Sequence, residues 1–274
     1  TPVHYTSGPG SRWSANVNTP AEKTDFAASL ETLVADLPNC QAASLVVSWF
    51  GGDLRCGSCE VRPKVEKKQY EGENMPWTVS GLTRVTAEAM PLEDERPIYG
   101  GTPTDQSVVQ AIQAMHGAGK EVLFYPSGTS VSYSGPQEWS FSRFILHYAA
   151  LCRAAGGVEA FCIGTEMRGL TQIRGAGNRF VAVARLIDLA GQVRSILGPD
   201  TKISYAADWS EYFGYQPQDG SNDRYFHLDP LWADPNIDFI GIDNYMPISD
   251  WREGDDHLDA AAGSVYDLDY LRSN

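Results

Sequence analysis

Helical segments alternate with continuously apolar segments of strand length, and this alternation restricts the possible folds more than any other feature. Strands that are apolar throughout and separated by helices are typical of a parallel sheet covered on both faces. The predicted helices cover residues 19–37, 104–116, 141–155 and 180–197. The predicted strands cover residues 43–50, 121–125, 158–163, 202–207 and 237–243.

Local signals set the expected boundaries of these elements. Thr19-Pro20-Ala21-Glu22 has the pattern of a capping box and predicts the start of the first helix. Pro126 is expected to end the strand before it. Residues 51–104 are polar and longer than a usual connection, so they predict a functional loop or a decoration, with a hairpin around Trp77-Thr78-Val79.

The ends of the predicted strands separate the two parallel architectures. A doubly wound sheet favours a glycine-rich phosphate loop after the first strand, and neither GxGxxG nor GxxxxGK[ST] occurs. A barrel instead places polar residues at the carboxyl ends of several strands. We therefore predict an α/β fold, a (β/α)8 TIM-barrel-like single domain over residues 1–274. The strand-end residues are Trp49, Glu166, Asp208, Trp209, Asp243, Asn244 and Tyr245.

Charge and hydropathy exclude some classes of partner. The chain has 35 acidic and 21 basic side chains and a formal net charge of −14, which opposes binding to nucleic acid. No apolar run approaches the roughly 18 residues of a membrane span. The first residues, Thr1 to His4, have neither an initiator Met nor the features of a signal peptide. We expect a segment from inside a longer polypeptide that is made in the cytoplasm.

The cysteines predict neither a disulfide framework nor a metal site. There are five, an odd number in a long chain. Cys56 and Cys59 have a suggestive spacing, but no second pair of ligands accompanies them, so a structural turn is favoured over metal or redox chemistry. No cofactor is predicted.

Carboxylates interleaved with aromatic rings predict a carbohydrate site at the mouth of the barrel. Aromatic faces pack on the C–H faces of sugars, while carboxylates and amides bind hydroxyls. Glycoside hydrolysis needs a protonated acid at the leaving oxygen and a second carboxylate. Glu166 suits the acid because the end of a buried strand would desolvate it partly. Substrate binding is predicted for Trp49, Asp208, Trp209, Asp243, Asn244 and Tyr245, whereas Glu211 is expected to start a helix.

Three motifs resemble those of a known family. They are Ile163-Gly164-Thr165-Glu166-Met167, Ser204 to Trp209, and Ile237 to Pro247. In this order they are similar to clan-A, β-mannanase-like glycoside hydrolases. They resemble more closely the TIM-barrel-like domain of the tail-hub protein of gene transfer agents and tailed phages. The resemblance implies that Glu166 follows the fourth strand and is the general acid/base.

The chain departs from the family pattern in two places. The family's nucleophile is a second glutamate after the seventh strand, and no acid beyond Tyr245 follows an apolar strand run. The last two strands are therefore expected to be missing from this segment, which would leave the barrel incomplete. The segment 126–136 is also shorter than the loop that the family resemblance implies at this place.

Three functions remain open. The first is a glycosidase domain of a phage-like tail or baseplate hub, which acts on cell-surface glycan or peptidoglycan during DNA delivery. The second is an inactive structural or carbohydrate-binding hub module, and the third is a free-standing glycosidase, which the missing strands disfavour. The resemblance also implies other tail proteins as partners, a symmetric homo-oligomer, and a place in the tail of a virion-like particle at the bacterial surface or periplasm.

Overall fold

Residues 1–53, 55, 58–128, 139–245 and 249–273 are described by the computed structural model, and they form two units. The first unit covers Thr1–Ile242 and the second Asp243–Asn274. The second unit contains two short helical segments, η2 (Ala260–Ala262) and α8 (Leu268–Ser273). That residues 1–274 form one domain stays a prediction.

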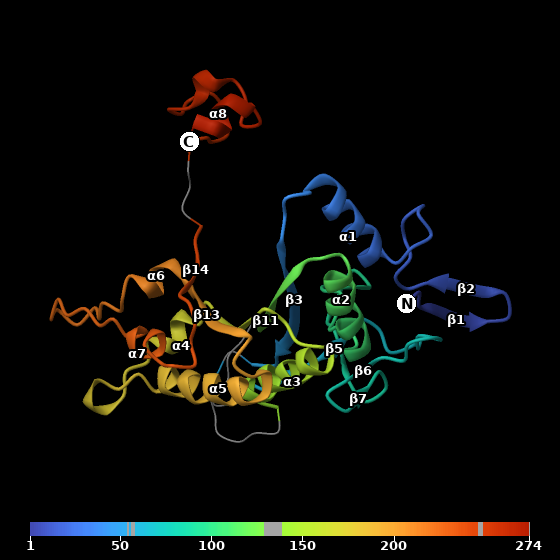
Figure 1. Ribbon diagram of the computed structural model, residues 1–274, viewed down its shortest axis with the longest axis horizontal. Coiled ribbons are helices and arrows are strands. Elements are labelled where there is room, and N and C mark those ends of the chain that lie inside the picture. The colour runs from blue at the N-terminus through green and yellow to red at the C-terminus, as the bar shows by residue number, and fades with distance from the viewer. Residues whose placement is uncertain (54, 56–57, 129–138, 246–248, 274) are drawn as a thin grey trace. The chain divides into compact units, whose positions relative to one another are not determined.

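A six-stranded sheet is the framework of the first unit, in the order β14-β13-β12-β11-β3-β4 (Figure 1). The neighbours from β3 to β13 pair in parallel, whereas β4 runs antiparallel to the end of β3. Within the described residues the two outer strands do not pair with each other, so the sheet is open. The parallel sheet and the incomplete barrel both agree with the prediction. The strands are β3 (Ala42–Gly51), β4 (Val61–Arg62), β11 (Glu121–Gly128), β12 (Ala160–Thr165), β13 (Lys202–Asp208) and β14 (Gly241–Asp243).

Helices cover one face of this sheet and build the core with it. Val47, Phe124 and Phe161 from successive strands pack in one cluster with Ile112 and Phe144 from the helices. This is the burial that the helical spacing predicts. The main helices are α1 (Asp25–Asp36), α2 (Asp105–Gly117), α3 (Phe141–Ala154) and α5 (Val181–Leu197). The shorter ones are α4 (Arg168–Thr171), η1 (Ala176–Asn178), α6 (Trp209–Tyr212) and α7 (Asp229–Trp232).

The opposite face is less covered than the sequence predicts. Val46 of β3 is 55% exposed, and Ile240 and Ile242 at the β14 edge are also exposed. These positions are apolar because the interior of a barrel is apolar, but an interior is buried only where the sheet closes on itself. The expectation of a sheet covered on both faces is therefore wrong at β3 and β14, whereas consecutive residues of β12 and β13 are buried on both faces.

Three predicted boundaries shift. The first helix begins at Asp25, where the Thr24 side chain accepts the backbone N–H of Ala27 at 3.3 Å, and not at Thr19. Pro126 lies inside β11 and does not end it, because the strand continues to Gly128 and Pro126 is in register with Val47 of β3. The last predicted strand, 237–243, shortens to β14 at the edge of the sheet.

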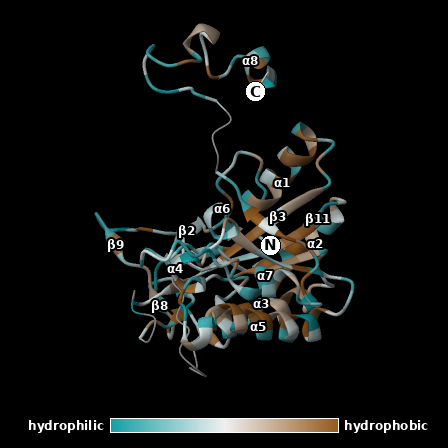
Figure 2. Ribbon diagram, turned by 90° about the vertical axis from the view of Figure 1, so that its left-hand side faces the viewer, coloured by the Kyte–Doolittle hydropathy of each residue, from teal (hydrophilic) through white to brown (hydrophobic). Residues whose placement is uncertain are grey.

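The long segment between β3 and α2 is built from short strands, and its predicted hairpin is confirmed. β6 (Thr78–Val79) pairs with β7 (Leu82–Thr83), and both turn residues, Ser80 and Gly81, have positive φ, as a tight hairpin turn requires. Figure 2 shows the apolar sheet beside this more polar periphery. The other short strands are β1 (His4–Gly8), β2 (Ser11–Ser14), β5 (Lys64–Val65), β8 (Glu88–Ala89), β9 (Leu92–Glu93) and β10 (Arg96–Pro97).

No helix in the described ranges has both the length and the apolar character that a membrane crossing needs.

Candidate functional site

A β-bulge at the end of β12 sets the position of Glu166. Cys162 pairs with Ser204 and Thr165 with Ala206, so β12 has one more residue than β13 over this interval. The extra residue brings Thr165 onto the same face as Cys162, although simple alternation would separate them. The Tyr125 hydroxyl from β11 lies 2.5 Å from the Thr165 hydroxyl on this face. Glu166 then follows as the first residue beyond the strand.

The backbone of Glu166 is strained and is held from β13. Its φ is +47°, in the left-handed region that residues other than glycine seldom adopt. Its N–H donates to the Ala206 carbonyl at 2.9 Å, and the next N–H, that of Met167, donates to the Tyr205 hydroxyl oxygen at 2.8 Å. Such strain persists only where the surroundings fix it, and it is common at functional sites.

The Glu166 side chain is exposed, so this part of the prediction is corrected. The sequence predicts partial desolvation at the end of a buried strand, but the open face of the sheet leaves the residue in contact with solvent. In addition, β12 is the third parallel strand counted from β3. The family resemblance places Glu166 after the fourth barrel strand, and this count would need one more strand before β3. The role of Glu166 as acid/base stays a prediction.

Glu211 is the buried carboxylate of this region. It is only 1% exposed and accepts hydrogen bonds from Thr171 Oγ1 at 2.5 Å and from the Asp208 backbone at 3.0 Å. The Tyr205 hydroxyl lies 3.0 Å from Glu211 Oε2 and 3.1 Å from Oε1. Burial raises the pKa of Glu211 above its usual value, although these hydrogen bonds oppose the shift. Glu211, Tyr205 and the Met167 N–H thus form a chain of hydrogen bonds that ends beside Glu166.

Glu211 is also the third helical residue of α6, as the sequence predicts. Asp208 and Glu211 form a complete capping box around the start of this helix. That the carboxylate is buried is not evident from the sequence. The Asp-x-x-Glu spacing gave a signal for the cap, but the burial comes from Thr171 and Tyr205, which are distant in sequence.

His227 closes the same buried cluster. Its Nε2 lies 3.4 Å from the Thr171 hydroxyl, and its ring packs on Phe180. Burial lowers the pKa of His227, so the neutral imidazole is favoured at pH 7. The sequence gave no signal for this contact, because His227 follows a polar loop.

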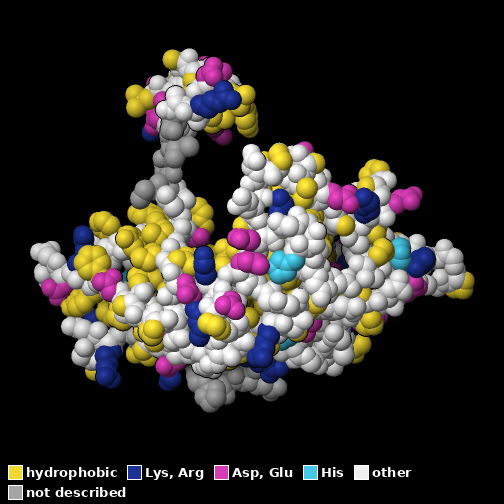
Figure 3. Space-filling model, viewed as in Figure 1, with side chains coloured by type: hydrophobic (Ala, Val, Ile, Leu, Met, Phe, Trp, Pro, Cys, Tyr) yellow, Lys and Arg dark blue, Asp and Glu magenta, His cyan; other side chains and the backbone are white. Residues whose placement is uncertain are grey.

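Asp208 and Trp209 lie at the end of β13, next in the sheet to Glu166. Asp208 accepts the Ser210 backbone N–H at 2.8 Å, so its carboxylate serves the cap of α6. Trp209 is 44% exposed and could stack on a ligand. Hydrophobic side chains gather over α6 in Figure 3. The exposed aromatic residues of α6 and of the loop that leads from it to α7 are Trp209, Tyr212, Phe213 and Phe226.

Trp49 is corrected from a substrate-binding residue to a core residue. It is fully buried, its indole N–H donates to the Tyr148 hydroxyl at 3.1 Å, and it packs on Phe144 and Trp139. The aromatic character of the end of β3 therefore serves packing and leaves no ring face for a ligand.

The remaining predicted residues lie in the second unit. Asp243 is half-buried, and Asn244 and Tyr245 are exposed. Their role in substrate binding stays a prediction.

The described ranges contain no cluster of three or more His, Cys, Asp or Glu side chains that could hold a metal ion. Cys59 is a buried free thiol. Cys56 and most of the 126–136 segment lie outside the described residues.

Comparisons with known proteins agree with the fold. Residues 139–274 match the family model described as "GTA TIM-barrel-like domain". With the parallel sheet, this match confirms the predicted TIM-barrel-like α/β class. A search of curated proteins gave no match.

Several solved structures are similar to the chain at low sequence identity. One is a GH113 β-1,4-mannanase, with 16% identity, a TM-score of 0.48 and coverage of 88% of this chain and 62% of that chain. Another is the GH113 β-mannanase AaManA from Alicyclobacillus acidocaldarius in complex with ManMIm, with 16% identity, a TM-score of 0.45 and coverage of 84% of this chain and 58% of that chain. A third is a GH18 chitinase from Pseudoalteromonas aurantia, with 15% identity, a TM-score of 0.34 and coverage of 72% of this chain and 58% of that chain. The chain spans about three fifths of the length of these structures.

Proposed function

We propose that this chain is the glycan-directed TIM-barrel-like domain of a hub protein in a phage-like tail, and that it acts on cell-surface glycan or peptidoglycan during DNA delivery. The observation that carries the proposal is the placement of Glu166. A strained backbone, fixed by two hydrogen bonds from β13, holds this single carboxylate at the carboxyl end of a parallel strand. The match of residues 139–274 supports the tail context.

In the hydrolytic form of the proposal, Glu166 is the general acid. It protonates the glycosidic oxygen as the bond to the leaving sugar breaks, and the exposed ring of Trp209 supports a neighbouring sugar. A second carboxylate about 5–5.5 Å away would give retention, and about 6.5–9.5 Å would give inversion. The other acids at the end of β13, Asp208 and Glu211, are engaged in the cap of α6, so we propose that the second carboxylate comes from another part of the polypeptide.

The proposal includes the biological setting that the family resemblance implies. The domain would contact other tail or baseplate proteins and would form part of a symmetric homo-oligomer in a virion-like particle. Its target would lie on the bacterial surface or in the periplasm.

The test is hydrolysis by the complete polypeptide on purified peptidoglycan and on surface polysaccharide. Glu166→Gln removes the acidic proton but keeps the shape of the side chain, so we expect at least a 10²-fold loss of activity. Glu93→Gln, in exposed β9, is the matched control and should be fully active. Equal activity of Glu166→Gln and wild type would refute the acid assignment.

A second candidate function is glycan binding without hydrolysis. The engagement of Asp208 and Glu211 in the α6 cap favours it, because hydrolysis needs a second carboxylate and these two acids at the end of β13 already accept the hydrogen bonds of the cap. In that case wild type and Glu166→Gln would both be inactive, and both would sediment with insoluble peptidoglycan.

A further inference from the structure

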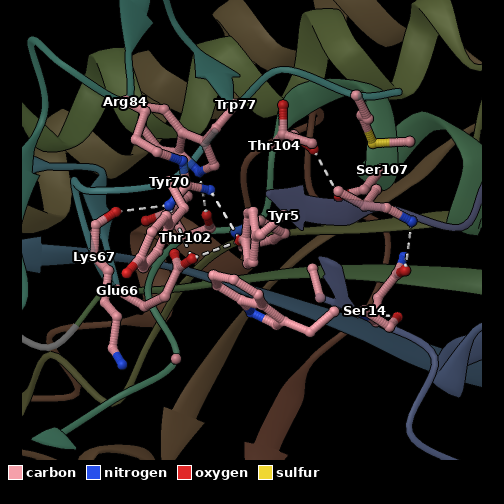
Figure 4. Close-up of a pocket in the computed structure, with 17 residues that line it drawn as sticks. Tyr5, Ser14, Glu66, Lys67, Tyr70, Trp77, Arg84, Thr102, Thr104 and Ser107 are labelled. Atoms are coloured by element: carbon pink, nitrogen blue, oxygen red, sulfur yellow. Dashed lines mark hydrogen bonds and ion pairs between the residues drawn. The ribbon is translucent and has the colours of Figure 1, made fainter. Parts of the chain in front are cut away.

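A cavity lies in the first unit between the β1–β2 hairpin and the segment that leads to α2. Its volume is about 460 Å³, within the range of small-ligand sites. None of its lining residues belongs to the candidate site around Glu166. Figure 4 shows Tyr5, Glu66, Tyr70 and Arg84 facing one another on one side, with Thr104 and Ser107 on the other.

A hydrogen-bonded network fixes one wall of this cavity. Glu66 Oε1 accepts from the Tyr5 hydroxyl at 2.9 Å and from Arg84 Nη1 at 2.8 Å. Arg84 Nη1 also donates to the Lys67 carbonyl at 2.7 Å, and the Arg84 side chain is nearly fully buried. Burial and the Glu66 carboxylate raise the pKa of Tyr5 to about 12, so its hydroxyl remains a donor. The wall is therefore preorganised, which lowers the entropy lost on binding.

Three aromatic rings form an apolar surface beside this network. The ring centroids of Trp13 and Tyr70 are 4.8 Å apart and nearly perpendicular, and Tyr5 lies 5.9 Å from Trp13 and 6.3 Å from Tyr70. Trp13 is 38% exposed, so part of its indole remains available to a ligand. Edge-to-face packing of the rings supports this exposed ring in one orientation.

Several polar groups at the cavity still have hydrogen-bonding capacity. Glu66 uses Oε1 for both of its bonds, which leaves Oε2 as an acceptor. The Tyr70 hydroxyl, the Trp13 indole N–H and the Lys67 ammonium make no hydrogen bond to the described residues. Trp13 and Lys67 are exposed side chains, and the half-buried Tyr70 has no buried hydroxyl that lacks a partner, so solvent or a ligand reaches these residues.

We propose that this cavity binds one sugar ring of a glycan. A pyranose presents an apolar C–H face and a ring of hydroxyls that donate and accept, which matches an exposed indole beside a carboxylate, a phenol and an ammonium. Arg84 forms ion pairs with both Glu66 and Glu71, so its guanidinium is not available to an inorganic anion. Exposed Lys67 would in addition favour a sugar that carries a carboxylate. The proposal does not depend on hydrolysis at Glu166.

The test is isothermal titration calorimetry on the 274-residue protein with two probes. Tri-N-acetylglucosamine is the neutral probe, and the disaccharide of N-acetylglucosamine and N-acetylmuramic acid is the carboxylated one. We expect saturable binding of at least one probe, and Trp13→Ala should raise Kd at least about tenfold, equivalent to about 1.4 kcal/mol. Trp13→Phe keeps an aromatic ring, so its Kd should rise less than that of Trp13→Ala. Lys67→Ala should weaken only the carboxylated probe.

Two controls separate this site from others. Tyr266→Ala removes an exposed aromatic ring from the second unit and should leave Kd within twofold. Glu93→Gln, in exposed β9, should also leave Kd within twofold. The readout is binding and not hydrolysis, so failure of the hydrolytic proposal does not affect this result. The inference is overturned if neither probe binds at millimolar concentration. It is also overturned if correctly folded Trp13→Ala and Trp13→Phe, checked by circular dichroism, bind as wild type does.

Discussion

Removal of one buried oxygen tests the hydrogen bonds that hold Glu166. Tyr205 is fully buried, and its hydroxyl accepts the Met167 N–H at 2.8 Å while it lies 3.0 Å from Glu211 Oε2. Tyr205→Phe keeps the packing of the ring but removes both interactions. The residue beside the strained backbone of Glu166 then loses its bond to β13.

The expected loss follows from these two contacts. A buried N–H left without a partner costs about 1–3 kcal/mol, and a hydrogen bond to a charged group contributes about 1.5–3 kcal/mol. Local relaxation recovers part of the sum, because Glu211 keeps its bonds from Thr171 and Asp208. We expect Tyr205→Phe to lower the free energy of unfolding by about 2–4 kcal/mol, a large part of the usual total.

Urea denaturation followed by tryptophan fluorescence measures this loss. Tyr212→Phe is the control, because Tyr212 is half exposed on α6 and should change the free energy of unfolding by less than about 0.5 kcal/mol. The loss in Tyr205→Phe should grow as the pH rises through the raised pKa of Glu211, since Glu211 then ionises without the Tyr205 donor. If the two variants are equally stable, the Tyr205 hydroxyl does not hold this segment.

Two further variants test the same region. Burial raises the pKa of Glu211 in the folded state, so the folded chain binds more protons than the unfolded chain. The contribution of Glu211 to stability therefore decreases as the pH rises through and above about 4.5. In urea titrations the free energy of unfolding of Glu211→Gln relative to wild type should increase from pH 4 to pH 8, and a constant difference would contradict the burial of this carboxylate. Glu166→Gly should be more stable than Glu166→Ala by about 0.5–1 kcal/mol, because glycine adopts a φ of +47° without strain; equal melting temperatures of these two variants would show that the backbone at 166 relaxes.

The sequence was sufficient to predict elements that depend on local patterns. The apolar runs at 121–125 and 202–207 became β11 and β13, and the helical spacing at 180–197 became α5, which ends at Gly198 with a φ of +85°. Trp77-Thr78-Val79 was correctly placed in a hairpin, because the Ser80-Gly81 turn is itself a local signal.

Features that depend on a neighbouring strand or a distant residue could not be predicted. Pro126 continues β11 because it stays in register with β3, and Trp49 is buried because α3 covers it. The burial of Glu211 needs Tyr205 and Thr171, which are brought together only by the folded sheet. Exposure of Glu166 likewise depends on how far the sheet closes, which no local spacing encodes.

The bulge in β12 separates the orientation of this strand end from the exact length of the chain. Three residue steps from Cys162 to Thr165 oppose two steps from Ser204 to Ala206, so the bulge absorbs the additional residue and Thr165 stays on the face of Cys162. Deletion of Gly164 would restore regular pairing with β13 and would leave Thr165 opposite Ala206, on the same face. A homologous sequence could thus be one residue shorter at this strand end and still present the same side chains.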